Sequence, residues 1–336
     1  MNIFRCAFLS LLLIVAFNSK GLAQAEVDSA YIEYVNSSWD EVQGTEKDDS
    51  IQTKYASEFY DYYLNNGETV AGEKAIQSAL LMWGNTGNAT MMDNAITKFD
   101  PDSDIWSWVP NSLGSAYARD SNRTHQEAIT KLESLKDKIT NPDGKSAILA
   151  SLVRVYKRNP DTHHKALNYA QQLVNINESD WYVDLGLGAI YELESLSIGQ
   201  AAPEFTATTY HGVEFNLADH KGKYIILDFW ATWCGPCMPE IPVIKSLRES
   251  YSEDDLAIVS IALEEKSEKY ENFLSEKEMT WPQILQEKKW EDEIPTLYNV
   301  GGIPQKYIIG PEGNIVAKHL RGEKLTFKMD SLINRK

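Results

Sequence analysis

The chain is most constrained by the stretch from Tyr224 to Cys237, which reads YIILDFWATWCGPC. Its apolar run over residues 225–230, interrupted only by Asp228, is typical of a strand that is buried on both faces. Apolar residues then recur at helical spacing, at Ile241, Ile244, Leu247 and Tyr251. The two cysteines of this stretch are therefore expected at a turn between a buried strand and a helix.

Gly235 and Pro236 separate the two cysteines, and Cys234 falls near the N-terminus of the predicted helix. The free N–H groups and the dipole at a helix N-terminus favour an anion, which lowers the pKa of a thiol from about 8.5 to about 7 or below. Such a thiolate can attack a disulfide, and a second cysteine three residues later can resolve the mixed disulfide. A zinc site needs further ligands that are not found nearby, and Met238 excludes the haem-attachment motif. We therefore expect a redox-active Cys234–Cys237 pair with no metal and no other cofactor.

Asp228 is the one charged residue inside the predicted buried strand. A buried carboxyl group costs free energy unless it is paired or functional. Burial would raise its pKa, so that it could take and return a proton near neutral pH. The alternative is a structural aspartate that is hydrogen bonded to the local backbone.

The sequence Asp-Phe-Trp-Ala-Thr-Trp-Cys-Gly-Pro-Cys resembles the active-site strand and turn of the thioredoxin superfamily, and its Ala-Thr-Trp resembles the exported TlpA/ResA-like branch. The segment 198–205, IGQAAPEF, is similar to the opening of exported thioredoxin-like and peroxiredoxin-like families. The resemblance covers roughly Ile198 to Lys336. It implies an α/β thioredoxin-like domain over residues 197–336, with a central mixed sheet flanked by helices.

The resemblance also implies roles for residues of the strand and turn. Cys234 would attack as the thiolate, and Cys237 would resolve the intermediate. Asp228 matches the buried acid of thioredoxin that assists deprotonation of the second cysteine. Trp230 and Trp233 would pack against the site and shield it.

A second segment, Tyr298 to Gln305, is similar to the part of thioredoxin that carries a cis-proline. It implies a cis bond between Ile303 and Pro304, with the proline packed against the cysteines. The backbone of Ile303 would pair with the substrate chain. Gln305 replaces the threonine common at that position, which leaves the substrate preference open.

Other elements of this domain are expected from local pattern. Predicted strands cover residues 205–210, 212–217, 256–262, 306–309 and 314–319, and predicted helices cover 267–277 and 324–333. The helix after Cys237 should be kinked by Pro242. Residues 281–285 and the charge run over 287–293 resemble an inserted region of the TlpA/ResA-like branch, and the charge run is predicted to be a solvated face.

Residues 1–25 are predicted to be a cleavable signal peptide. Arg5 precedes an apolar core over residues 7–17, and Ala23-Gln-Ala25 offers a cleavage site. The core is shorter than the ~20 residues that span a bilayer, although an uncleaved anchor is the alternative. Export, with the periplasm as the expected compartment, would remove Cys6 and leave one cysteine pair.

Residues 26–196 are predicted to form an α-helical domain. Helical spacing appears over residues 51–64, 70–83, 89–99, 124–139, 145–158, 164–176 and 181–193. The last helices resemble tetratricopeptide-type repeats, and a plain helical bundle fits equally well. No catalytic pattern stands out, so docking to a partner protein or self-association is the expected role.

The predicted function is therefore that of an exported thiol:disulfide oxidoreductase acting on protein disulfides. The Gly-Pro pair favours reduction over oxidation, and a reductase outside the cytoplasm needs an electron donor, which we expect to be membrane-associated. A net charge of −17 argues against nucleic acid as a partner. Two alternatives are a thiol peroxidase of the AhpC/TSA type, and a partner-binding helical protein on a thioredoxin-like scaffold. The first is disfavoured because Thr232 lies two residues before Cys234, whereas the peroxidase pattern places it three residues before.

Overall fold

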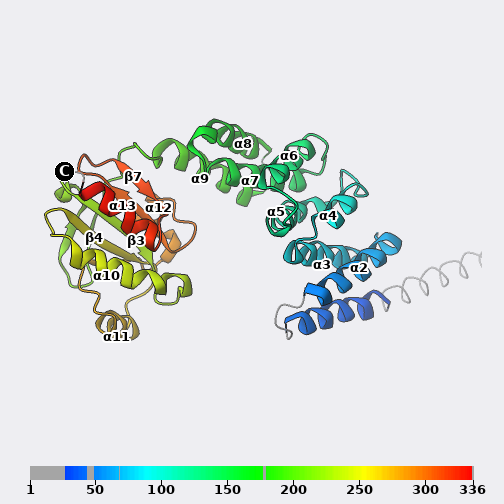
Figure 1. Ribbon diagram of the computed structural model, residues 1–336, viewed down its shortest axis with the longest axis horizontal. Helices are drawn as coiled ribbons and strands as arrows, with labels where there is room; N and C mark the ends of the chain where they lie inside the picture. Colours follow the sequence, from blue (N-terminus) through cyan, green and yellow to red (C-terminus); the bar gives the residue numbers. More distant parts are fainter. Residues whose placement is uncertain (1–26, 44–48, 68, 177–178, 335–336) are drawn as a thin grey trace, which may run out of the picture. The chain divides into compact units, whose positions relative to one another are not determined.

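The computed structural model describes residues 27–43, 49–67, 69–176 and 179–334 (Figure 1). One compact unit of the chain ends at Leu187, and a second begins at Gly188. This division lies inside helix α9 (Asp180–Ser195), and the predicted domain boundary between residues 196 and 197 lies just after that helix. The predicted signal peptide lies outside the described residues.

The described part of the first unit is helical. Residues 27–43 are helical, and the further elements are α2 (Asp49–Asn66), α3 (Val70–Thr86), α4 (Ala89–Ile96), η1 (Asp104–Ser107), α5 (Val109–Arg119), α6 (His125–Leu135), α7 (Pro142–Tyr156), η2 (Pro160–Thr162), α8 (His163–Ile176) and the start of α9. Each helix predicted here is present with shifted ends, whereas residues 27–43, η1 and α5 were not predicted. Helices pack on near neighbours in the chain, α2 on α3, α3 on α5 and α7 on α8.

Local capping explains where several of these helices begin and end. The Thr69 side chain accepts a hydrogen bond from the N–H of Gly72 at the start of α3, and Gly87 ends that helix with a φ of 74°. Thr124 and Glu127 form a reciprocal capping box at the start of α6. Trp106 is buried in the core of this unit, whereas Trp108 is exposed.

The second unit contains a five-stranded mixed sheet with the order β5-β4-β3-β6-β7 (Figure 1). Its strands are β3 (Tyr224–Trp230), β4 (Leu256–Ala262), β5 (Gln283–Leu285), β6 (Gln305–Ile309) and β7 (Ile315–Lys318). Strands β3, β4 and β5 are parallel, and β6 and β7 join by antiparallel pairing. A separate hairpin pairs β1 (Thr206–Thr208) with β2 (Glu214–Asn216). The sheet flanked by helices agrees with the predicted α/β domain.

The helical elements of this unit lie between and after the strands. They are η3 (Leu217–His220), η4 (Gly235–Glu240), α10 (Ile241–Ser250), α11 (Glu268–Glu276), η5 (Lys289–Glu291), α12 (Glu293–Leu297) and α13 (Glu323–Ile333). The predicted kink at Pro242 is wrong. Pro242 lies in the first turn of α10, where no intrahelical N–H bond is lost, and the short 3-10 helix η4 precedes it.

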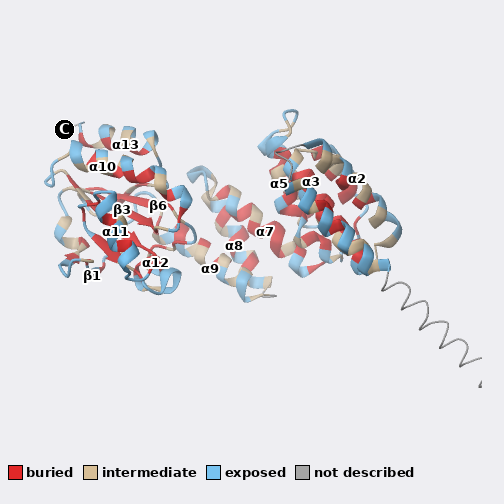
Figure 2. Cartoon of the chain, turned by 90° about the horizontal axis from the view of Figure 1, so that it is seen from below, coloured by how far each residue is buried: buried red, intermediate tan, exposed pale blue. Residues whose placement is uncertain are grey.

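Two apolar clusters cover the two faces of the sheet, as the buried strands in Figure 2 indicate. Ile226 and Trp230 of β3 belong to the cluster that also contains residues of α10, α11 and α13. Leu227 and Phe229 belong to the cluster on the other face. Because side chains alternate along a strand, Asp228 lies on the face covered by α10 and α13.

Candidate functional site

Cys234 and Cys237 are joined by a disulfide at the end of the central strand, with Cα atoms 5.3 Å apart. The N–H of Cys234 donates to the carbonyl of Ala231 (3.2 Å), and the N–H of Cys237 donates to the carbonyl of Cys234 (3.0 Å). Cys234 is the N-terminal flanking residue of η4, so the cysteines lie at a strand-to-helix turn. Cys234 is 4% exposed and Cys237 is 1% exposed, so both residues are buried and Cys234 is slightly the more exposed.

Several residues predicted for the site surround this disulfide. Trp230 is buried in the same apolar cluster as both cysteines, and Ile303 packs against that cluster. The indole N–H of Trp230 donates to the Gln283 side chain (3.3 Å). Gly235 and Pro236 are exposed at the turn.

The Ile303–Pro304 peptide bond is cis, as the resemblance implies. Pro304 is buried, and its carbonyl accepts a hydrogen bond from the Arg321 side chain (2.8 Å). Gln305, which departs from the family pattern, is buried and donates to the Tyr307 hydroxyl (3.1 Å). Its side chain is therefore held within the domain.

Glu264 fixes the turn that precedes the cysteines. Its carboxylate accepts hydrogen bonds from the Thr232 N–H (2.6 Å) and the Thr232 hydroxyl (2.8 Å). The Trp233 indole N–H donates to the carbonyl of Leu263 (3.3 Å), the residue before Glu264. The loop after β4 thus anchors the turn before the cysteines through two successive residues.

Trp233 is 51% exposed, and its ring lies edge-on to that of Trp290, with centroids 6.4 Å apart. Trp290 belongs to η5 and is 39% exposed. The segment 287–293 was predicted as a solvated charge run, but it also supplies this aromatic side chain. Exposed aromatic pairs are typical of binding surfaces.

Strand register brings three polar side chains together on the buried face of the sheet. Asp228 pairs with Ser260 of β4 on one side and with Lys306 of β6 on the other. The Ser260 hydroxyl donates to Asp228 Oδ2 (3.1 Å) and itself accepts the Trp281 indole N–H (2.8 Å). Lys306 Nζ lies 3.4 Å from Asp228 Oδ1, an oxygen that has no hydrogen-bond partner.

Glu240, the last residue of η4, completes this buried cluster. Lys306 Nζ donates to Glu240 Oε2 (3.0 Å), and the N–H of Gly322 donates to the same oxygen (3.2 Å). Lys306 is 1% exposed, so its ammonium group lies between two carboxyl groups and away from water. The cluster joins β3, β6, the cysteine-bearing helix and the loop before α13.

Burial raises the pKa of the Asp228 carboxyl above its ordinary value. The positive charge of Lys306 and the hydrogen bond from Ser260 oppose this rise in pKa, whereas the negative charge of Glu240 adds to it. Asp228 is therefore a carboxyl group that holds its proton to higher pH than an exposed aspartate.

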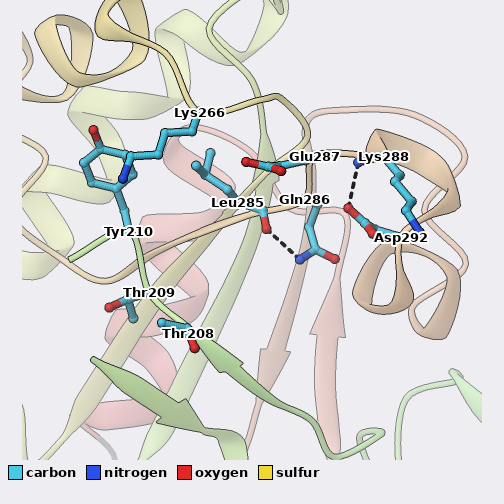
Figure 3. Close-up of a pocket in the computed structure, with 9 residues that line it drawn as sticks. All are labelled: Thr208, Thr209, Tyr210, Lys266, Leu285, Gln286, Glu287, Lys288 and Asp292. Atoms are coloured by element: carbon cyan, nitrogen blue, oxygen red, sulfur yellow. Dashed lines mark hydrogen bonds between the residues drawn. The ribbon is translucent and has the colours of Figure 1, made fainter. Parts of the chain in front are cut away.

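A pocket of about 440 Å³ opens near the ends of β1 and β5 (Figure 3). Its lining residues are Thr208, Thr209, Tyr210, Lys266, Leu285, Gln286, Glu287, Lys288 and Asp292. Many of its polar groups are already engaged: the Lys288 N–H donates to Asp292 (2.8 Å), and Lys266 lies over the Tyr210 ring. The lining does not include the cysteines, although Lys288 and Asp292 flank η5, which carries Trp290.

Sequence reasoning missed Lys306, Glu240, Glu264 and Trp290. Two of them carried a usable signal. Lys306 is a charged residue that directly precedes the buried residues 307–309 of strand β6, and Asp228 is likewise a charged residue within the buried strand β3. Glu240 lies at helical spacing with Cys237 and Ile244, on the face that is otherwise apolar. Glu264 and Trp290 had no such signal, because Glu264 lies in the polar segment after β4 and Trp290 lies in η5, within the charge run.

Within the described residues, no group of three or more His, Cys, Asp or Glu side chains is arranged to hold a metal ion. Over the same part of the chain, no helix combines the length and apolarity needed to span a membrane.

Residues 198–318 match the AhpC/TSA family. The thioredoxin-like protein YneN of Bacillus subtilis is 38% identical over 144 residues, which covers 41% of this chain and 82% of that protein. The thiol-disulfide oxidoreductase ResA of Geobacillus kaustophilus is 31% identical over 124 residues, which covers 37% of this chain and 70% of that protein. Among solved structures, the thioredoxin domain of a thiol-disulfide oxidoreductase from Bacteroides vulgatus is 30% identical, with a TM-score of 0.39, and the match covers 42% of this chain and all of that one.

Proposed function

This chain belongs to the TlpA/ResA-like branch of the thioredoxin superfamily and is a thiol-disulfide oxidoreductase, and from that membership we propose that it is an exported reductase of protein disulfides. The observation that carries the proposal is the Cys234–Cys237 disulfide at the end of the buried strand β3. Its cysteines need no metal or organic cofactor to exchange electrons with a substrate disulfide.

The proposed reaction has two steps. In the reduced protein, the Cys234 thiolate attacks one sulfur of a substrate disulfide, which forms a mixed disulfide and releases the other substrate sulfur as a thiolate. The Cys237 thiol then loses its proton and attacks Cys234 Sγ, which releases the second substrate thiolate. Two electrons pass to the substrate, and the protein ends with the Cys234–Cys237 disulfide. The greater exposure of Cys234 supports its role as the attacking residue.

Asp228 is proposed to accept the proton of Cys237 in the second step. Its raised pKa supports this role, because burial moves the pKa of the carboxyl group toward the neutral range in which an efficient general base works. Pro304 and the backbone of Ile303 are proposed to shape the substrate groove beside the cysteines. Trp230 packs under the site, whereas the exposed Trp233 is proposed to contact the substrate polypeptide.

The reducing direction rests on the Gly-Pro pair between the cysteines, which resembles reducing thioredoxins. The proposed export and the proposed periplasmic location both rest on the signal-peptide pattern of residues 1–25. A reductase in that compartment needs a supply of electrons, for which we propose a membrane-associated donor. The helical unit is proposed to dock a partner protein or a second copy of the chain.

The two alternative functions gain no comparable support. The AhpC/TSA match carries a name used for peroxidases, but Thr232 stands two residues before Cys234 and is hydrogen bonded to Glu264. A purely structural thioredoxin-like scaffold would not require a pair of cysteines in disulfide geometry at the end of the central strand.

The test is the reduction potential of the Cys234–Cys237 pair, equilibrated against thiol buffers. A value near about −270 mV, as in thioredoxin, is expected for a reductase, whereas a value near about −120 mV would identify an oxidant. In parallel, Cys237→Ser should accumulate mixed disulfides through Cys234, and Cys234→Ser should not. Absence of trapped polypeptide in both variants would contradict the assigned roles.

A further inference from the structure

Lys306 is the one cation that the structure places between the buried Asp228 and Glu240 carboxyl groups among the described residues. All three side chains are nearly inaccessible to water. Two ionised carboxylates and one ammonium group would leave a net negative charge in the apolar interior, which is costly. One of the two carboxyl groups is therefore expected to hold a proton when the other is ionised.

The contacts distinguish the two carboxyl groups. Glu240 Oε2 receives the Lys306 ammonium at 3.0 Å and the Gly322 N–H at 3.2 Å, and both donors stabilise an ionised oxygen. Asp228 receives only a neutral hydroxyl donor from Ser260, and Lys306 lies farther from it at 3.4 Å. These contacts therefore favour the neutral form of Asp228, in the same direction in which burial shifts its pKa.

We propose that Lys306 is a positioning residue, paired with the Glu240 carboxyl group, that keeps Asp228 able to exchange a proton with the Cys237 thiol. This inference rests on the proposed function, in which Asp228 accepts that proton. Among the described residues, the side-chain contacts of Lys306 are with Asp228 and Glu240, so its effect on the cysteines would pass through these two carboxyl groups.

Charge explains why Asp228 needs this cation. Burial and the negative charge of Glu240 both raise the pKa of Asp228, and Lys306 is the largest influence that lowers it. Without Lys306, Asp228 would keep its proton to higher pH, so it could accept the Cys237 proton only at higher pH. The other groups that face Asp228 are Ser260 from β4, with Trp281 behind it, and neither carries a charge.

The proposal is tested by following the second step alone. Reduced full-length protein is mixed with 5,5′-dithiobis(2-nitrobenzoic acid) in a stopped-flow instrument. The first phase releases one thionitrobenzoate as Cys234 attacks, and the second phase releases another as Cys237 resolves the mixed disulfide. The pH midpoint of the second-phase rate reports the proton acceptor of Cys237, because Cys234 no longer titrates once it is in the mixed disulfide.

Lys306→Met should move this midpoint upward by about one to three pH units, the range expected for loss of an adjacent opposite charge. Glu240→Gln should move it downward, because it removes the negative charge that opposes ionisation of Asp228. Lys306→Arg should keep the midpoint of the unchanged protein. A merely structural role for Lys306 would not produce shifts of opposite sign.

Lys318→Met is the matched control. Lys318 forms a largely buried ion pair with Glu192 (2.9 Å) in the same unit, and it has no recorded contact with Asp228 or Glu240. It should lower stability as Lys306→Met does, but it should leave the midpoint unchanged. If Lys306→Met does not fold, the downward shift expected for Glu240→Gln and the unchanged midpoint expected for Lys306→Arg still test the proposal.

The Asp228→Asn variant separates the hypothesis that Asp228 accepts the Cys237 proton from the hypothesis that Lys306 positions Asp228. If it leaves the second-phase profile intact, Asp228 is not the acceptor and the proposed relay fails. If it abolishes the profile while Lys306→Met or Glu240→Gln leaves the midpoint unmoved, the relay stands and the role of Lys306 is overturned. A double variant, Asp228→Asn with Lys306→Met, should behave like Asp228→Asn alone.

Discussion

Replacing Asp228 with asparagine should stabilise the sheet at alkaline pH, although it removes a hydrogen-bonded side chain. Burial raises the pKa of Asp228 in the folded protein above the value of about 3.9 for an unfolded chain. Between those two pKa values the folded state holds a proton that the unfolded state has released. The free energy of unfolding of the unchanged protein therefore falls as pH rises through this window.

The magnitude follows from the single proton involved. One proton corresponds to a slope of at most about 1.4 kcal/mol per pH unit, and the loss ends at the pKa of the folded protein. Asparagine has no such slope, and it leaves the ion pair between Lys306 and Glu240 in place. The opening equilibrium constant of the unchanged protein, divided by that of the variant, should thus rise by up to about tenfold per pH unit. The rise ends at the pKa of Asp228 in the folded protein.

Hydrogen exchange followed by mass spectrometry measures this difference in the full chain. Peptides that cover β4 (residues 256–262) are the best reporters, because β4 pairs with β3 along its length and is itself unchanged in the variant. At each pH the intrinsic exchange rates cancel, so the ratio of the two rates gives the difference in opening free energy. The exposed Asp254→Asn variant is the control and should show a constant ratio. A ratio for Asp228→Asn that stays constant from about pH 4 upward would refute the argument that burial perturbs this carboxyl group.

Three further perturbations test other parts of the molecule. Trp290→Ala should lower kcat/KM for a protein disulfide by about two- to tenfold, which corresponds to the loss of one aromatic contact. It should leave the rate with a small disulfide unchanged. The control is Phe327→Ala, because Phe327 is exposed on α13. Glu264→Gln should weaken amide protection at Thr232 by about tenfold, because a carboxylate acceptor is lost from two hydrogen bonds; unchanged protection would show that the loop is held by other contacts. Thr124→Ala should destabilise the helical unit by about 1 kcal/mol through loss of the capping box, measured as faster exchange in α6, and equal rates would disprove this effect.

Local signals were sufficient for most of the architecture of the second unit. The apolar run at residues 225–230, the turn at Gly310–Gly313 and the helical spacing after Cys237 each predicted an element that is present. The helical character of the first unit followed from periodicity alone, yet α5 was missed because Pro110 and Gly114 obscure its pattern. Pro242 was misinterpreted because the sequence does not reveal where a 3-10 helix ends and an α-helix begins.

By itself the sequence determined the cysteine pair, the buried acid and the cis-proline, because each is carried by residues adjacent in the chain. Only the tertiary structure decided what surrounds Asp228. Antiparallel register sets Lys306 opposite Asp228, and a shift of one residue would turn that side chain to the other face of the sheet. Glu240 joins them because η4 and α10 pack over the same face, and it meets Lys306 across 66 residues of chain. Local propensity encodes neither strand register nor helix packing, so the buried charges of this site appear only once the sheet is assembled.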